Sequence, residues 1–470
     1  MLTLSSLHLA VPVPGRTLPF SLSHVGPAAL SEPLGAALRA QWTYGFPTVP
    51  KPGLQLTHGF LQYPAGMQAI AAAHLLEVLP RGTILDPFVG GGTTLVEAMR
   101  CGRRAVGADA SPLALFASAH HTWRAQDVEL EELRAQATAA LLRVDPKFVP
   151  ALEQPPSDQP SPADAAPPPA AGSVEAHVAM SSKVRSVPKL ERGGAHKTSF
   201  RDWAPLRAKI EELIAEASDT GSDTPVANDA PSREINHEAL SPLWFCFAAA
   251  QQRSERYKYK SPLASFDATV DSYCLALRAF RDVTPDASAA SPPRLLLSDA
   301  RQLSLSARGL PLADGLITSP PYAGVYDYLS HARESRARLG AQGPAPLMGL
   351  QGTPDGRTWP KGWRSTNEMG ARKQMRKQTF HGEFRTAWEA DQRAWLTQAR
   401  DNLRAGGRAA LLIGDGEGGL DALASTSAAA EDVGLIVLAS ATIVSTVESQ
   451  AKRQKGKRRP EHAVLLEVPN

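Results

Sequence analysis

The 470-residue chain has few cysteines and no long apolar run. Its three cysteines, Cys101, Cys246 and Cys274, show neither the spacing of a metal site nor the even number of a disulfide framework. No segment approaches membrane-spanning length, and the N-terminus has no basic start followed by a long apolar stretch. These absences exclude a disulfide-rich scaffold and an integral membrane protein. They predict a cytoplasmic protein that has core thiols, no metal site and no membrane partner.

The overall composition is that of an ordinary globular protein, with 43% hydrophobic and 21% charged residues. A net charge of +3 says little, but basic residues gather at 253–260 (RSERYKYK), 372–377 (RKQMRK) and 452–459 (KRQKGKRR). One such run is usually a solvated surface, whereas three in a nearly neutral chain suit a polyanion. The side chains expected to contact nucleic acid are Arg372, Lys373, Arg376, Lys377, Lys452 and Arg453.

The most informative stretch is 84–96 (ILDPFVGGGTTLV). It predicts a short apolar strand that ends at Asp86, a glycine turn at 90–92, and a helix that Thr93 or Thr94 can cap. A turn of this kind lets a ligand lie against bare backbone at a helix N-terminus. The glycines are not followed by Lys-Ser/Thr, as in a phosphate loop, and their spacing is not the GxGxxG of dinucleotide binders.

A second stretch, 314–322 (DGLITSPPY), places two adjacent prolines after a short apolar run. Because Leu316 and Ile317 read as a strand, Ser319 and the prolines should lie at the carboxyl end of that strand. A doubly wound fold with an ordinary Pro-Pro loop is the plain alternative, and a Rossmann oxidoreductase would leave this loop unexplained.

In this order, the two stretches resemble the DPFxGxGTT and [DNS]PP[YFW] loops of S-adenosylmethionine-dependent DNA methyltransferases that act on exocyclic amino groups. Gly91 stands where many members have Ser. The resemblance covers about 58–120, 294–332 and 388–468. It implies an α/β, Rossmann-like class I methyltransferase fold: a mostly parallel seven-stranded sheet with a C-terminal antiparallel hairpin, plus insertions.

The resemblance also implies a cofactor, S-adenosyl-L-methionine, and the residues that hold it. Segment 58–67 (HGFLQYPAGM) is similar to the family's methionine-binding segment, and Asp299 occupies the acidic position near the adenine amine. Asp109 lies about 20 positions past the glycines, where doubly wound folds place a carboxylate for ribose hydroxyls. The expected cofactor-binding residues are Tyr63, Pro64, Asp86, Phe88, Gly90, Gly92, Thr93, Thr94, Asp109 and Asp299.

The implied reaction is methyl transfer to an exocyclic amine of a base in DNA. The expected catalytic residues are Ser319, Pro320, Pro321 and Tyr322, and the Ser form favours N4 of cytosine over N6 of adenine. A tRNA or rRNA amino methyltransferase uses the same loops, often with Asp or Asn before Pro-Pro. The remaining alternative is a catalytically silent methyltransferase-like DNA-binding subunit. A restriction or defence-system protein is a candidate partner, and the oligomeric state stays open.

Composition and motifs together divide the chain into six segments. Residues 147–235, rich in Pro and Ala, are expected to be largely disordered. The segments are an N-terminal arm (1–57), the cofactor half of the core (58–125), a helical insertion (126–290), the catalytic half (291–334), a basic insertion suited to target recognition (335–387) and the C-terminal part of the core (388–470).

Overall fold

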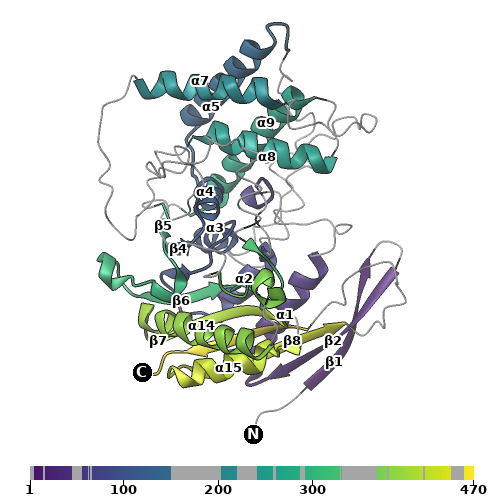
Figure 1. Cartoon of the computed structure of the whole chain (residues 1–470), viewed down its shortest axis with the longest axis vertical. Coiled ribbons are helices and arrows are strands. Elements are labelled where there is room, and N and C mark those ends of the chain that lie inside the picture. The colour runs from purple at the N-terminus through teal and green to yellow at the C-terminus, as the bar shows by residue number, and fades with distance from the viewer. Residues whose placement is uncertain are drawn as a thin grey trace, which may run out of the picture.

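The structure is a computed structural model of the whole chain. It describes every residue except 1–4, 14–15, 45–55, 62, 64–65, 150–202, 220–240, 258–260, 286–291, 329, 331–367, 378–380, 417–418 and 446–459. The described residues form an α/β fold around one mixed sheet (Figure 1).

The sheet has nine strands in the described part of the chain, in the order β1-β2-β8-β9-β7-β6-β3-β4-β5. Seven of these nine point the same way, while β2 and β9 run opposite, so the expected mostly parallel sheet is confirmed. The strands are β1 (Ser5–Val13), β2 (Arg16–Val25), β3 (Ile84–Asp86), β4 (Ala105–Asp109), β5 (Arg294–Leu297), β6 (Ala313–Thr318), β7 (Leu403–Gly414), β8 (Ile436–Ser445) and β9 (Glu461–Glu467).

The expected C-terminal antiparallel hairpin is confirmed as β8 and β9, but the expected count of seven strands is wrong. Two further strands come from the N-terminus, where β1 and β2 form a hairpin that extends the sheet by pairing β2 with β8. Phe20 and Leu22 alternate with serines along β2 and are buried. This period-two pattern is the signal that the sequence reading missed.

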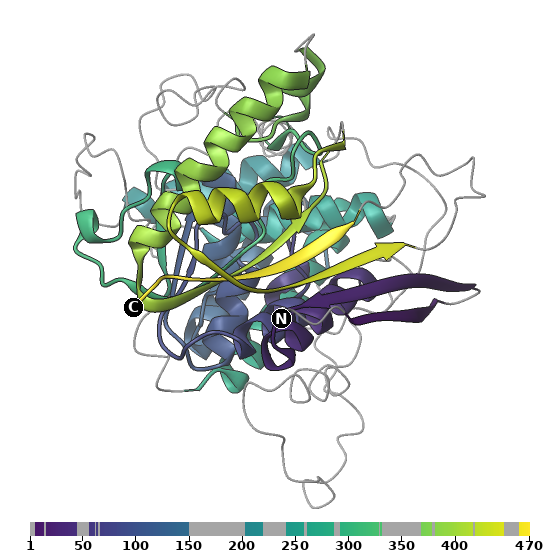
Figure 2. The same ribbon diagram turned by 90° about the horizontal axis from the view of Figure 1, so that it is seen from below.

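Helices cover both faces of the sheet and make three layers. Figure 2 shows α14 (His381–Asn402) and α15 (Ala422–Asp432) on one side and α1 (Ala28–Tyr44) on the other. Neighbouring strand residues enter different cores, as Leu411 faces the α14 side and Leu412 the α1 side. This alternation is what two buried faces require.

Most of the remaining described helices complete the layer on the α1 side or build a helical region beside it, whereas α13 (Arg372–Lys377) packs against α14. That region, α5 (Asp127–Val144), α7 (Ala204–Asp219), α8 (Pro242–Tyr257) and α9 (Pro262–Val283), gathers at the top of Figure 1. Apart from α7, nearly all of the expected disordered stretch 147–235 lies outside the described residues. No helix among the described residues has the length and apolarity to cross a bilayer. The other helices are α2 (Ala69–Glu77), α3 (Thr93–Arg100) and α4 (Pro112–His121).

Candidate active site

Four neighbouring parallel strands end at or next to residues that the sequence predicted to lie in the site. Asp86 closes β3, Asp109 closes β4, and Ser319 follows β6 directly. Asp299 follows β5 by two residues. The strand order reverses between β3 and β6, since β4 and β5 lie on one side of this point and β7 on the other. Sheets of this kind bind ligands outside the carboxyl ends of the strands at such a reversal.

A cleft lies at this edge of the sheet, with about 940 Å³ of free space that includes open solvent. The predicted site residues that line it are Tyr63, Asp86, Phe88, Gly90, Thr93, Thr94, Asp109, Asp299, Ser319 and Pro321.

The glycine loop, residues 87–92, turns sharply between β3 and α3. Gly90 and Gly92 have φ of 50° and 80°, a left-handed conformation that favours glycine. Gly92 faces α4 instead of lining the cleft, and a Cβ there would lie 2.9 Å from the Ser118 Oγ. At Gly91 the nearest atom to an added Cβ, the Tyr63 Cβ, is at 3.6 Å, an ordinary contact.

Asp109 ties the glycine loop to the end of β4. Its Oδ2 accepts from the Gly90 N–H at 3.0 Å, and its Oδ1 accepts from the Ser111 N–H at 2.8 Å. Burial raises the pKa of Asp109 to about 7, although these two hydrogen bonds oppose the rise. A carboxylate has further lone pairs, so ribose hydroxyls can still donate to it.

Asp86 joins the two sequence motifs. The Thr318 hydroxyl at the end of β6 donates to the Asp86 Oδ1 at 2.6 Å, and the Phe88 N–H donates to the same oxygen at 3.1 Å. Burial raises the pKa of Asp86 to about 6. The hydrogen bond therefore fixes the glycine loop beside Ser319 at the point where the strand order reverses.

Residues of α4 support the back of the glycine loop. The Ser118 hydroxyl donates to the Gly90 carbonyl at 2.9 Å, and the His121 Nδ1 donates to the Gly91 carbonyl at 2.6 Å. The His121 Nε2 accepts the Leu61 N–H at 3.4 Å, which requires a neutral ring. Burial lowers the pKa of His121 to about 4, in agreement with a neutral ring.

The Pro-Pro loop, residues 319–323, follows β6. Ser319 and Pro321 line the cleft, but Pro320 and Tyr322 are not among the lining residues. The Tyr322 ring packs on the backbone of Gly414 at the end of β7, where a Cβ would lie 2.5 Å from the Tyr322 Cε2. Burial raises the pKa of the Tyr322 hydroxyl.

Asp299 is held by a guanidinium that the sequence reading did not assign to the site. Arg301 also lines the cleft, and its Nη2 donates to the Asp299 Oδ2 at 2.6 Å. Its Nη1 donates to the Asp391 Oδ1 at 2.6 Å. These contacts raise the pKa of Arg301, and Asp299 thus carries a charge that is already paired.

Aromatic rings cover the glycine loop and the adjoining wall. Tyr63 lies over Gly90 and stacks on Tyr328, with ring centroids 6.3 Å apart and planes at 12°. Phe88 meets Trp395 edge-on at 5.4 Å. Pro64, the other predicted residue of this segment, lies outside the described residues.

The residues predicted to contact nucleic acid fall into two groups. Arg372 and Lys373 begin α13, where the Lys373 N–H donates to the Asp327 Oδ1 at 2.8 Å. The side chains of Arg376 and Lys377 are outside the described part of the structure, as are Lys452 and Arg453 altogether. The structure therefore places Arg372 and Lys373 beside the residues that follow the Pro-Pro loop.

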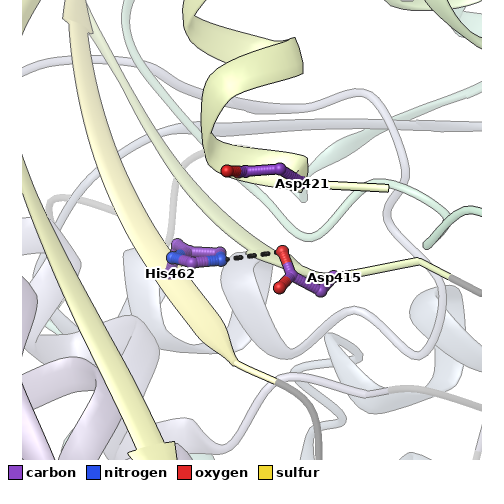
Figure 3. Close-up of side chains that lie close together, drawn as sticks. All are labelled: Asp415, Asp421 and His462. Atoms are coloured by element: carbon purple, nitrogen blue, oxygen red, sulfur yellow. Dashed lines mark hydrogen bonds and ion pairs between the residues drawn. The ribbon is translucent and has the colours of Figure 1, made fainter. Parts of the chain in front are cut away.

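Figure 3 shows a mixed cluster made of Asp415, which directly follows β7, Asp421, which directly precedes α15, and His462 on β9. Its ligand atoms all lie within 4.8 Å of one another. Each side chain has a protein partner: the His462 Nε2 contacts the Asp415 Oδ1 at 3.0 Å, and the Asp421 Oδ1 accepts the Ala424 N–H at 2.9 Å. These bonds indicate that the cluster stabilises the chain at the end of β7.

The lining residues that the sequence reading did not assign to the site include Arg301, Tyr328, Glu368 and Met369. Tyr328 belongs to a YDYLSH pattern next to the Pro-Pro loop, which was the one available signal. Glu368 and Met369 follow a long undescribed segment, and nothing local marks them. No protein-family model matches the chain, and comparison with curated proteins finds no match.

Proposed function

We propose that this protein transfers a methyl group from S-adenosyl-L-methionine to an exocyclic amino group of a base in DNA. N4 of cytosine is the favoured acceptor and N6 of adenine the other. The observation that carries the proposal is the hydrogen bond from Thr318 to Asp86, because it sets both motifs of the family resemblance in one cleft. We further propose that the α/β fold is a Rossmann-like class I methyltransferase fold. It is supported by the order β5-β4-β3-β6-β7, the doubly wound order 3-2-1-4-5.

The cleft suits this cofactor chemically. Gly90 and Gly91 line the cleft without side chains, and Asp109 offers carboxylate oxygens to the ribose hydroxyls. Asp86 is buried and Asp109 is partly buried, and the hydrogen bonds that they accept come from neutral donors, so a positively charged ligand would stabilise their ionised forms. When bound, S-adenosylmethionine supplies an electrophilic methyl group on a sulfonium.

The protein's task is to prepare the acceptor. An aromatic amine is a poor nucleophile, because its lone pair is delocalised into the ring. The Ser319 hydroxyl oxygen and the Pro320 carbonyl would accept its two N–H hydrogens and draw the nitrogen towards a tetrahedral shape. Adjacent prolines fix their own φ and hold that carbonyl in place. Tyr322, supported by Gly414, would stack on a base flipped out of the duplex. Most of the acceleration then comes from positioning.

DNA is the proposed polymer because Ser precedes the prolines and because Arg372 and Lys373 lie on the catalytic side. Phosphate contacts by such residues give affinity without sequence preference. We place the reaction in the cytoplasm, with a restriction or defence-system protein as a candidate partner.

The test is transfer of labelled methyl groups to duplex DNA, single-stranded DNA and total RNA in parallel, followed by nucleoside analysis. We expect N4-methylcytosine or N6-methyladenine in duplex DNA. Label confined to RNA would replace the substrate and identify an RNA amino methyltransferase. Cofactor binding without label in any polymer would contradict the proposed activity and indicate a silent subunit.

A further inference from the structure

Three tyrosine rings form a row that runs from the glycine loop to the molecular surface. Tyr63 lies over Gly90, where an added Cβ would be 3.2 Å from the Tyr63 Cδ1. Tyr63 stacks on Tyr328, and the Tyr328 ring centroid lies 5.6 Å from that of Tyr326, with the ring planes at 44°. Tyr63 and Tyr328 line the cleft, whereas Tyr326 is 40% exposed. This tyrosine row therefore connects the cleft to solvent.

The exposure of the Tyr326 ring distinguishes it from the other aromatic side chains. Among the residues whose side chains the structure describes, it is the only tyrosine, phenylalanine or tryptophan that is exposed. Aromatic rings carry a large apolar surface, which folding normally buries. A ring that stays in solvent next to a ligand cleft has a flat face that a planar ligand can cover.

Hydrogen bonds to the start of α13 hold the backbone that carries Tyr326. The Tyr326 carbonyl accepts the Arg372 N–H at 3.1 Å. The Asp327 Oδ1 accepts the Lys373 N–H at 2.8 Å. A ring on a backbone that is already held loses less conformational entropy when it binds a partner. Tyr326 is thus presented to solvent from a fixed position.

Two basic side chains lie along the same segment as this exposed ring. The Arg372 Nε lies 3.9 Å from the Asp327 Oδ2, and the Lys373 ammonium donates to the Ser330 hydroxyl. Arg372 is partly exposed and Lys373 is exposed. Cations contact the phosphates of a nucleic acid, and aromatic rings stack on its bases. The segment therefore offers both kinds of contact to one nucleic-acid strand.

We infer that Tyr326 stacks on the DNA base next to the flipped target base. The inference rests on the proposed function and deepens it, because it assigns a base contact to a residue outside both motifs of the family resemblance. Flipping a base out of the duplex removes a stacking partner from its neighbours. A ring at the rim of the cleft replaces that partner, and it does so for any sequence, since every base has an aromatic face.

The test is fluorescence anisotropy of the full chain with two labelled single strands of equal length. One strand is a deoxythymidine oligonucleotide, and the other has the same sugar-phosphate backbone without bases. Tyr326→Ala should weaken binding of the deoxythymidine strand about tenfold and leave binding of the abasic strand within about twofold, because it removes stacking alone. Tyr326→Phe keeps the ring and should bind both strands as the wild type does.

Two further variants separate stacking from folding and from charge. Leu312→Ala removes an exposed apolar side chain just before β6, at the opposite end of that strand from the Pro-Pro loop, and should change neither affinity. Lys373→Gln should weaken binding of both strands to the same extent, because each strand has phosphates. Equal loss for both strands in Tyr326→Ala, or no loss for either, would overturn the inference.

Methyl transfer to duplex DNA by the wild-type protein, measured on the same preparation, tests the proposed function separately. Transfer by the wild type together with unchanged strand binding in Tyr326→Ala would overturn the inference alone. A wild-type protein that binds neither strand and transfers no methyl group to DNA would overturn both.

Discussion

The glycine loop and the Pro-Pro loop lie side by side in one cleft but are held in different ways. Hydrogen bonds from nearby residues hold the glycine loop, since Asp109, Ser118 and His121 are 19 to 30 positions from the glycines that they contact. The Pro-Pro loop rests on distant segments: Tyr322 packs on Gly414 of β7, and Gly370 packs beneath the Tyr322 carbonyl. The glycine loop is thus held mainly by residues close to it in sequence, whereas the Pro-Pro loop is held by residues far from it in sequence.

The largest expected effect on cofactor affinity comes from replacing Gly92 of the glycine loop with serine, and replacing its neighbour Gly91 is the matched control. Gly92→Ser places a Cβ against Ser118 at a φ of 80°, and cofactor affinity should fall by more than about 100-fold. Gly91→Ser meets Tyr63 at an ordinary 3.6 Å and should keep affinity within about threefold. Calorimetry with S-adenosylmethionine measures both. Equal losses would show that the loop is not held as described.

On the other loop, Gly414→Ala should affect transfer and spare cofactor binding. Its Cβ would lie 2.5 Å from the Tyr322 Cε2, so the ring must move. Because a displacement of about 1 Å can cost on the order of 100-fold in rate, we expect a 10- to 100-fold loss of methyl transfer. The cofactor Kd should change less than about threefold. A weakened Kd with an unchanged rate would reverse the roles assigned to the loops.

A smaller effect concerns the pH dependence of stability without ligand. Burial raises the pKa of Asp109 from 3.8 to about 7, so between those pH values the folded state binds a proton that the unfolded chain releases. This group therefore makes the protein less stable as pH rises from 4 to 7. His121, with a pKa lowered to about 4, acts in the opposite direction below its ordinary value of 6.5.

The variant Asp109→Asn isolates the contribution of the carboxyl. Urea unfolding at pH 5 and pH 8 should show wild-type protein losing more stability towards pH 8 than the variant does, by about 1 kcal/mol or more. His121 is present in both proteins, so its contribution cancels. The same pH dependence in both would mean that Asp109 titrates normally.

The smallest expected effect is at the edge of the site. Lys373→Gln should weaken duplex DNA binding about 3- to 10-fold and reduce the slope of log K against log salt by about one, as for one lost phosphate contact. Arg393→Gln, at an exposed position on α14, is the matched control. Titration of a fluorescent duplex at several salt concentrations measures both. An unchanged salt slope would show that Lys373 does not contact a DNA phosphate.

The sequence predicted the positions of the two loops well, because each motif follows a short apolar run that must be a buried strand. The α/β class, the C-terminal hairpin and the strand-end position of Asp109 follow from local patterns of that kind. The β1–β2 hairpin was missed because its alternation is short and its partner, β8, lies at the other end of the chain.

Side chains that act through long-range contacts could not be predicted from the sequence either. The pairing of Arg301 with Asp299 is local, but its second bond to Asp391 depends on how α14 packs. Glu368 lines the cleft because residues 368–373 pair with the residues after the Pro-Pro loop. No local sequence pattern predicts that pairing. The sequence does not distinguish His121 from any other buried helical histidine, because its hydrogen bond to the glycine loop is visible only in the structure.

The most direct measurement is methyl transfer to duplex DNA by wild-type protein, Ser319→Ala and Tyr322→Ala, with cofactor affinity measured on the same samples. We expect both variants to lose transfer by about 1,000-fold or more while the Kd for S-adenosylmethionine stays within about threefold. Wild-type transfer rates in both variants would contradict the assignment of the Pro-Pro loop as the catalytic element.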